Sequence, residues 1–314
     1  MIRISPPAVD LRIAPGYGVT RDGQPLSYNR APAPDLAPWI ARVYVAKIDV
    51  PAEHTLSCGY FTDTGCLRIQ LSGQWRVDSR FGTREFGRSA LFFGPQTRLT
   101  PVSVTGGFVS IGVAIRPSAC SLLLGGRVRD VVDRIETTDA VSLPPDLVLA
   151  QLETDVPPED LLRAVEDMLR LRIEQIGGAE PEPASARFED IAFTAPTMEV
   201  AQAAREIGVD RRRLERMVDR DFGMSPKQVL KRARALDMAS HLRGVADDDE
   251  AEALTLRYYD ESHLIHDFVE LFGMSPRQFS AKPQPLLTMT LEARQARRLE
   301  RMNRIAPGAR RPWQ

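Results

Sequence analysis

The chain has 314 residues, with 41 Lys and Arg against 42 Asp and Glu, so its formal net charge at pH 7 is −1. This length favours two domains, and 43% hydrophobic with 26% charged residues excludes wholesale disorder and fibrous repeats. The near-zero charge also argues against a nucleic-acid partner, because phosphate binding needs a basic surface, although a total can hide a local excess.

The cysteines and the N-terminus point to a cytoplasmic protein. Cys58, Cys66 and Cys120 are an odd number in a long chain, which favours free thiols in a reducing compartment. The N-terminus places prolines and Asp10 where a signal peptide needs its apolar run. The longest uncharged stretch, 99–115, is interrupted by proline and glycine and is too short to span a bilayer.

The first half of the chain is expected to be rich in strands. The first 35 residues have the Pro and Gly content of an irregular arm. From 40 to 145, β-branched and aromatic segments alternate with turn residues, as in WIARVYVAKIDV, CLRIQLSGQWRVDS, ALFFGP and FVSIGVAI. This density predicts a small antiparallel sandwich or barrel.

A helix and a linker follow the strands. Pro157 and Pro158 precede EDLLRAVEDMLRLRIEQIG, whose apolar residues fall at helical spacing and predict an amphipathic helix near 158–176. Its apolar stripe fits either core packing or a dimer contact. GGAEPEPASA then has the composition of a linker. Divided there, residues 1–185 hold 19 cations and 22 anions, whereas residues 186–314 hold 22 and 20.

The sharpest feature is an internal repeat at an offset of 50 residues. FGMSP at 222–226 recurs at 272–276, each time followed by a basic residue and Gln. In each copy Gly can close a helix, Ser can cap the next one, Pro suits its first position and Gln completes a capping box. A junction with no role beyond folding explains the motif alone equally well. We expect cap or structural roles for Gly223, Ser225, Pro226, Gly273, Ser275 and Pro276.

The same offset extends the repeat upstream. It relates 210–218 to 260–268, where an Asp can cap each helix and apolar residues at i, i+4 define a buried face. MEVAQAAREIGV, at 198–209, supplies a preceding helix that ends at Gly208. A glycine between such a helix and a second one rich in exposed arginines is the helix-turn-helix pattern.

Here the chain resembles a known family. IGVDRRRLERMVDRDFGMSPKQVLKRARALDMASHLR and LRYYDESHLIHDFVELFGMSPRQF are similar to the DNA-binding domain of AraC/XylS-type bacterial transcription regulators, over about residues 190–282. The resemblance implies two helix-turn-helix units whose second helices enter successive major grooves of double-stranded DNA, and RNA polymerase as a further partner. A joining helix over 225–243 would be roughly 28 Å long, which suits a spacing of about one DNA turn, roughly 34 Å.

The N-terminal half more loosely resembles the cupin-like β-barrel effector domains of such regulators, notably at 112–135. We therefore predict an α+β two-domain fold, with a cupin-like β-barrel followed by helices and an all-α tandem helix-turn-helix domain. The resemblance implies a small-molecule effector and a homodimer. The expected parts are 1–176 for the sensory and dimerisation domain, 177–187 for the linker, 188–282 for the DNA-binding domain and 283–314 for a basic C-terminal extension.

Candidate DNA contacts lie early in the second helix of each unit. The bidentate pairing of Arg with guanine is the commonest specific contact, although Glu215 and Asp219 could instead neutralise the arginines on a solvated face. The second unit is acidic at Asp267 and Glu270, so we expect weaker binding from it. The candidates are Arg211, Arg212, Arg213 and Arg216 in the first unit and Ser262, His263 and His266 in the second.

The end of the chain is basic. Residues 291–314 hold seven arginines and predict a helix with a tail, which is either solvated or an extra phosphate clamp.

No catalytic constellation emerges. The N-terminal half has one histidine, His54, too few for a His-rich metal site, and its glycine pairs do not extend to a phosphate loop. We therefore expect no catalytic residue, metal or cofactor, and no enzyme. The leading hypothesis is a sequence-specific transcription regulator that responds to a small molecule in its N-terminal barrel. The alternative is a ligand-binding or interaction protein whose degenerate second unit leaves it without specific DNA binding.

Overall fold

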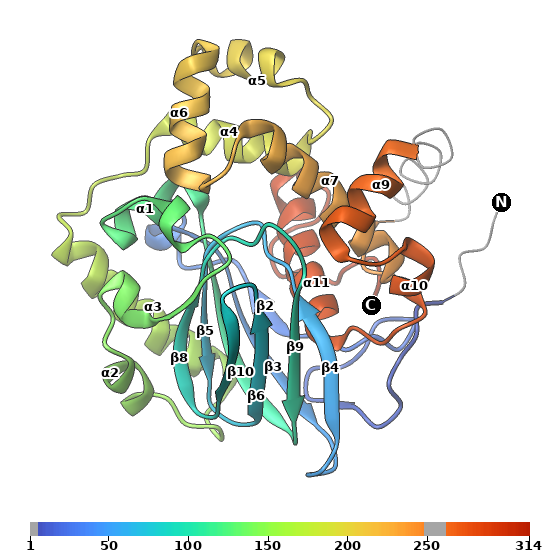
Figure 1. Ribbon diagram of the computed structural model, residues 1–314. Coiled ribbons are helices and arrows are strands. Elements are labelled where there is room, and N and C mark those ends of the chain that lie inside the picture. Colours follow the sequence, from blue (N-terminus) through green and yellow to red (C-terminus); the bar gives the residue numbers. More distant parts are fainter. Residues whose placement is uncertain (1–5, 248–261) are drawn as a thin grey trace.

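The computed structural model describes residues 6–247 and 262–314 (Figure 1). Its N-terminal part contains two antiparallel sheets. The larger sheet has the order β1-β3-β10-β5-β8-β11, with β2 also paired to β3, and the smaller has the order β4-β9-β6-β7. The larger sheet consists of β1 (Ala14–Pro15), β2 (Tyr28–Arg30), β3 (Ile40–Asp49), β5 (Cys66–Gln70), β8 (Ser89–Phe93), β10 (Phe108–Ile115) and β11 (Ile135–Thr137). The smaller consists of β4 (Thr55–Tyr60), β6 (Gln74–Ser79), β7 (Gly82–Phe86) and β9 (Thr100–Thr105).

Burial explains the different sequence patterns of the two sheets. Strand β5 is buried at every position, whereas β6 alternates between exposed and buried residues. The larger sheet therefore has helices on one face and the smaller sheet on the other, while the smaller sheet faces solvent on its outer side. The expected β-rich N-terminal domain and helical C-terminal region are confirmed.

The two sheets form a sandwich and not the closed barrel that we expected. Within the described residues, no strand of one sheet pairs with a strand of the other. Strand β4 is an edge of the smaller sheet, and helix α11 (Pro285–Arg301) packs against it and against β3. A helix thus covers the edge at which a barrel would continue its strand pairing.

Helices cover the outer face of the larger sheet. These are α1 (Pro117–Leu124), α2 (Pro145–Ala150) and α3 (Pro158–Gln175), with short 3₁₀ turns at η1 (Pro34–Leu36), η2 (Val128–Val131) and η3 (Thr138–Val141). The apolar stripe of α3, including Leu162 and Leu169, is buried in the same core as Val43 and Val113 of the sheet. Core packing therefore accounts for that stripe, and the homodimer stays a prediction.

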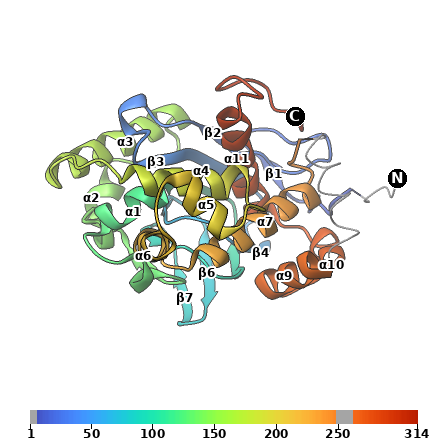
Figure 2. The ribbon, with the colours of Figure 1, turned by 90° about the horizontal axis from the view of Figure 1, so that it is seen from above.

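The C-terminal helices gather above and beside the sandwich (Figures 1 and 2). They are α4 (Pro183–Thr194), α5 (Val200–Ile207), α6 (Arg211–Phe222), α7 (Pro226–Leu242), α9 (Ser262–Phe272), α10 (Pro276–Ser280) and α11. Helix α4 begins inside the segment 177–187 that we expected to be a linker. Pro183 fits its first turn, and Phe188 is buried against Phe222 of α6, so the end of that segment already belongs to the helical core.

The C-terminal extension is not a solvated helix, and its role as a phosphate clamp stays a prediction. Most side chains of α11 are buried, and Leu291, Ala296 and Leu299 share a core with α7 and α9. Six of the seven arginines of 291–314 form ion pairs: Arg294 with Asp63 and Asp237, Arg297 with Glu189, Arg298 with Asp237, Arg301 with Asp190, Arg304 with Asp247 and Arg311 with Glu292. The basic composition of this segment thus serves internal ion pairs.

The linking helix α7 is anchored to the N-terminal domain. The buried Arg232 donates hydrogen bonds to the carbonyl oxygens of Gln96 and Asp63, at 3.0 and 2.6 Å. Arg243, also buried, donates to the carbonyl oxygen of Ala8 at 3.0 Å. These bonds satisfy buried guanidinium groups and fix α7 to the sandwich and to the N-terminal arm. No helix of the described residues has the length and apolar character needed to cross a membrane.

Candidate nucleic-acid interface

The first helix-turn-helix unit consists of α5 and α6. Gly208 ends α5 in the left-handed conformation, with φ +82°, a backbone geometry that favours glycine. Asp210 then caps α6, because its carboxylate accepts a hydrogen bond from the backbone N–H of Arg213 at 2.8 Å. Leu214 and Val218 are fully buried in the core that they share with α4 and α5. The opposite face of α6 is thereby fixed toward solvent.

The four candidate arginines lie on this outward face. Arg211, Arg212, Arg213 and Arg216 are all exposed. Within the described part of the chain, Arg212 and Arg216 form no ion pair, whereas Arg211 pairs with Glu215 one turn along the helix at 2.9 Å. Two unpaired cations, one turn apart on the outside of a second helix, are available to base edges or phosphates.

The carboxylate of Glu182, the residue just before α4, contacts the remaining cations of α6, of which Arg220 is also paired with Asp221 at 2.6 Å. The oxygens of Glu182 accept hydrogen bonds from Arg213 at 3.2 Å and from Arg220 at 2.9 Å. The hydrogen bond from Arg220, followed by that from Arg213, holds the pKa of Glu182 below its usual value, so this carboxylate is charged at neutral pH. Glu182 therefore binds two arginines of α6 at once, as a phosphate group also can.

The N-terminal domain also touches α6. Arg129 of η2 donates to the carboxylate of Asp219, and Ser121 of α1 donates to Asp221 at 2.7 Å. Gly223, which ends α6 with φ +68°, lies against Val132 and the backbone of Arg129. Helix α6 is thus attached to the N-terminal domain at its C-terminal end, and none of these contacts involves its N-terminal end.

Both copies of the repeat form the same junction. Gly223 and Gly273 end α6 and α9 with the same φ of +68°. Ser225 and Ser275 each accept a hydrogen bond from the backbone N–H of a Gln three residues on, and that Gln side chain accepts one from the Ser backbone. Pro226 and Pro276 are the first residues of α7 and α10.

The second reading helix, α9, is only partly described. The side chains of Ser262 and His263 lie outside the described residues. His266 is exposed on α9, at the position that corresponds to Arg216 in the repeat, and two apolar neighbours, Ile265 and Val269, are exposed beside it. This face can contact DNA through an imidazole and through apolar contact with thymine methyl groups.

The acidic residues of α9 are paired with the linking helix. Lys231 of α7 lies 2.9 Å from Asp267 and 2.6 Å from Glu270, and Arg234 lies 3.7 Å from Asp267. Burial opposes the charge on Lys231, but the hydrogen bonds to Glu270 and Asp267 outweigh it and raise the pKa of Lys231. The acids that we expected to repel phosphates are therefore neutralised from within the domain.

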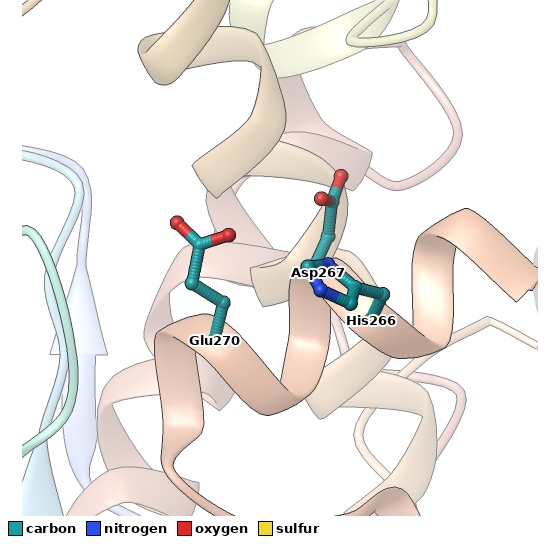
Figure 3. A group of neighbouring side chains, drawn as sticks. All are labelled: His266, Asp267 and Glu270. Atoms are coloured by element: carbon teal, nitrogen blue, oxygen red, sulfur yellow. The ribbon is translucent and has the colours of Figure 1, made fainter.

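The same acids belong to a cluster that resembles a metal site. Candidate ligand atoms of His266, Asp267 and Glu270 all lie within 4.8 Å of one another (Figure 3). The ammonium of Lys231 already contacts both carboxylates, so a cation would have to displace it. We assign no metal to this cluster.

The residues weighed for chemistry in the N-terminal half have structural surroundings. His54 is buried, and its Nε2 lies 2.8 Å from a carboxylate oxygen of Asp10. Cys58, Cys66 and Cys120 are free thiols, and the last two are buried. Burial raises the pKa of Cys120 to about 12, which makes it a poor nucleophile at neutral pH.

Sequence reasoning missed Glu182, Lys231 and Arg234 because their partners lie on other helices. The only available signal was opposite charge, which does not identify a pair when the two residues are 31 or more positions apart. What the sequence did show was the outward arginine face of α6, which depends on spacing within a single helix.

Helices α5 and α6 form one helix-turn-helix unit, and the described part of the second unit, α9 and α10, repeats its second helix and the junction that follows. Two family models match the chain: residues 203–282 match a family described as a helix-turn-helix domain, and residues 28–136 match a domain of unknown function (DUF6597). The first match spans both FGMSP copies and the helix between them. The C-terminal part of the chain is therefore an AraC-type helix-turn-helix domain, as the resemblance implied.

Several solved structures are similar to the chain at low identity. ToxT from Vibrio cholerae O395 gives a TM-score of 0.41 at 12% identity, with 76% of this chain and 96% of that chain covered. ToxT from V. cholerae strain SCE256 bound to an unsaturated fatty acid also gives 0.41 at 12%, with 76% and 94% covered. The AraC-like transcriptional activator CuxR gives 0.29 at 14%, with 62% and 76% covered. No curated protein sequence matches the chain.

Proposed function

We propose that the chain is a sequence-specific, DNA-binding transcription regulator whose two-sheet domain binds a small-molecule effector. In this proposal it is a cytoplasmic homodimer, and RNA polymerase is a further partner by family resemblance. The observation that carries the proposal is the pair of exposed, unpaired arginines, Arg212 and Arg216, on the second helix of a helix-turn-helix unit.

The anchoring of α7 supports the effector part of the proposal. Arg232 and Arg243 connect α7 to backbone carbonyls of the N-terminal domain. Helix α11 packs against α7 and also against strands β3 and β4 of that domain. A change of shape in the sandwich would therefore move α7, the helix that joins the two helix-turn-helix units. Coupling of this kind requires only that the effector bind two arrangements of the sandwich unequally.

The test compares the loss of DNA affinity caused by alanine substitutions in each of the two helix-turn-helix units. In mobility-shift titrations with the DNA upstream of its own gene, Arg212→Ala with Arg216→Ala should weaken binding by about a hundredfold or more, since each base contact contributes roughly 1–3 kcal/mol. Ser262→Ala with His263→Ala should weaken it modestly. Arg76→Ala with Arg163→Ala removes two exposed cations from the sandwich domain and serves as the charge-matched control.

Two outcomes would contradict the proposal. Equal and small losses from both pairs would show that α6 does not dominate DNA reading. Equal affinity for upstream and unrelated DNA across a salt series would favour the alternative, a ligand-binding or interaction protein without specific DNA binding.

A further inference from the structure

One strip of the N-terminal domain reaches from the first helix-turn-helix unit to the second. Val132 is buried in the core that contains Met217 and Phe222 of α6. At the other end of the strip, the backbone N–H of Leu99 donates a hydrogen bond to the carbonyl oxygen of Leu271 on α9, at 2.8 Å. We call residues 95–99 and 132–134 the bridge, because they connect α6 to α9 through the N-terminal domain.

Asp133 holds the two parts of the bridge together. Its carboxylate accepts hydrogen bonds from the backbone N–H and from the hydroxyl of Thr97, both at 2.6 Å. Its own backbone N–H donates to the carbonyl oxygen of Pro95 at 3.0 Å. Asp133 has a φ of +59°, which is uncommon for a residue other than glycine and persists only where surrounding contacts fix it. The bridge is therefore a defined part of the surface.

The turn between β6 and β7 packs its side chains against the bridge. Arg80 lies 3.3 Å from the carboxylate of Asp133, which balances its charge. Phe81, the next residue, is 51% exposed. The guanidinium carbons of Arg80 and Arg134 lie 4.7 and 4.3 Å from the centroid of its ring. The exposed ring thus holds the side chain of Arg134 at the surface by cation–π contact.

The bridge presents two uncompensated cations to solvent. Arg98 and Arg134 are exposed, and neither forms an ion pair with any residue that the structure describes. At the neighbouring positions Arg127 and Asp130, which are also exposed, one positive and one negative charge cancel. Because arginine is always charged at neutral pH, the bridge carries a local excess of positive charge in a chain whose total charge is −1.

The position of the bridge relates these cations to the DNA-binding helices. A duplex read by both α6 and α9 runs from one helix to the other, so its backbone passes over the surface that lies between them. Seen from above, β7 projects from the side of the molecule that carries both helices, and it lies between them (Figure 2). The turn that precedes β7 is the one that packs against the bridge.

We propose that Arg98 and Arg134 of the N-terminal domain bind phosphate groups of double-stranded DNA, between the two segments read by α6 and α9. The guanidinium group matches phosphate oxygens with two parallel hydrogen bonds. Such contacts carry no sequence information and add affinity that falls with salt. The N-terminal domain is then part of the DNA-binding surface. The inference rests on the proposed function, because it adds a contact to the same DNA.

The test measures how the affinity of the full chain for DNA depends on salt. Fluorescence anisotropy gives the affinity for the DNA upstream of its own gene and for unrelated DNA of the same length, from about 50 to 200 mM salt. Each phosphate contact contributes about 0.9 to the slope of log affinity against log salt, so Arg98→Gln with Arg134→Gln should lower this slope by about 1.8. The ratio of wild-type to variant affinity should therefore fall by roughly tenfold across this range, and equally on both DNAs.

Two matched variants separate this contact from a change in net charge. Arg21→Gln with Arg310→Gln removes two exposed cations that form no ion pair among the described residues. Both lie near the C-terminal end of the chain, on the side of the molecule opposite β7 (Figure 2), so this variant should keep the wild-type slope. Arg98→Lys with Arg134→Lys should also keep it, because a lysine still binds phosphate as a point charge. Melting temperatures equal to that of the wild type show that each variant is folded.

Three outcomes would overturn the inference. They are an unchanged slope in Arg98→Gln with Arg134→Gln, a decrease no larger than in the control with Arg21 and Arg310 replaced, and tighter DNA binding by the first variant. An unchanged slope would leave the two arginines to an acidic protein partner instead. Failure of the regulator proposal looks different: the wild type would bind upstream and unrelated DNA equally, while the first variant would still show the smaller slope on both.

Discussion

Glu182 offers a direct way to test whether the arginines of α6 bind phosphates. Its carboxylate bridges Arg213 and Arg220, and in Glu182→Gln the side chain keeps its size but loses its charge. DNA must displace this carboxylate if either arginine is to contact a phosphate. The substitution should therefore tighten DNA binding, because it removes an internal competitor.

The exposure of the two arginines sets the size of the effect. The side chains of Arg213 and Arg220 are 55% and 47% exposed, so each ion pair is worth only about 0.5 kcal/mol. Releasing Arg213 costs about 0.5 kcal/mol, whereas Arg220 stays paired with the buried Asp221 at 2.6 Å, so binding by the variant should be roughly two- to fivefold tighter. The gain should shrink as salt rises from about 0.1 to 0.3 M, because screening weakens the competing pairs as well.

Fluorescence anisotropy with labelled upstream DNA measures this difference. Glu180→Gln is the matched control, because it makes the same charge change two residues away at an exposed carboxylate that forms no ion pair among the described residues. Equal gains in DNA affinity in Glu182→Gln and Glu180→Gln would show that the tighter binding comes from the change in net charge alone. Weaker binding by Glu182→Gln would refute the reasoning and show that the carboxylate positions the arginines for DNA.

Three further predictions concern stability. Arg294→Met should lower the free energy of unfolding by about 3 kcal/mol in a urea titration, because Asp63 and Asp237 lose a buried partner. The control, Arg301→Met, removes an exposed ion pair and should lower the free energy of unfolding by less than about 1 kcal/mol. Gly112→Ala should lower the melting temperature through its clash with Tyr44, and an unchanged value would refute that packing. The hydrogen bond from Arg12 is the main reason that the pKa of Asp10 is lowered to about 2. The ionised carboxylate therefore stabilises the fold above its unfolded pKa of 3.8, and this stabilisation is lost as the pH falls through about 2. Asp10→Asn should therefore be less stable at neutral pH, and chemical unfolding should show the difference disappearing in strong acid.

The features that sequence predicted well are those determined within a few residues. The capping boxes at Ser225 and Ser275 need only the Ser, the Pro and a Gln three positions on. The outward face of α6 likewise follows from the apolar positions of one helix, and the α3 stripe from the positions of another. Such interactions are encoded locally, so a single sequence suffices to find them.

The features that sequence could not give depend on which distant segments meet. The acidity of α9 predicted repulsion from DNA, whereas Lys231, 36 residues before Asp267, neutralises it. The arginines of α11 predicted a solvated or DNA-bound helix, but Asp63 and Asp237 lie far away in the sequence. Charge counts carry no information about partners that only the tertiary fold brings together.

The return of α11 to the sandwich has a consequence for how the protein is made. Leu286 and Met289 complete the core between the two sheets, yet they are synthesised after more than nine-tenths of the chain. The two-sheet domain therefore leaves the ribosome before the helices that follow it but is completed only with the last of them, against the usual order in which the more N-terminal domain folds first. The unfinished sandwich must leave its β4 edge uncovered during synthesis of the entire DNA-binding domain, which makes that edge the place where misfolding or chaperone binding should begin. A stop codon before residue 285 would remove α11 (Pro285–Arg301), which covers the β4 edge and contributes Leu286 and Met289 to the core between the sheets.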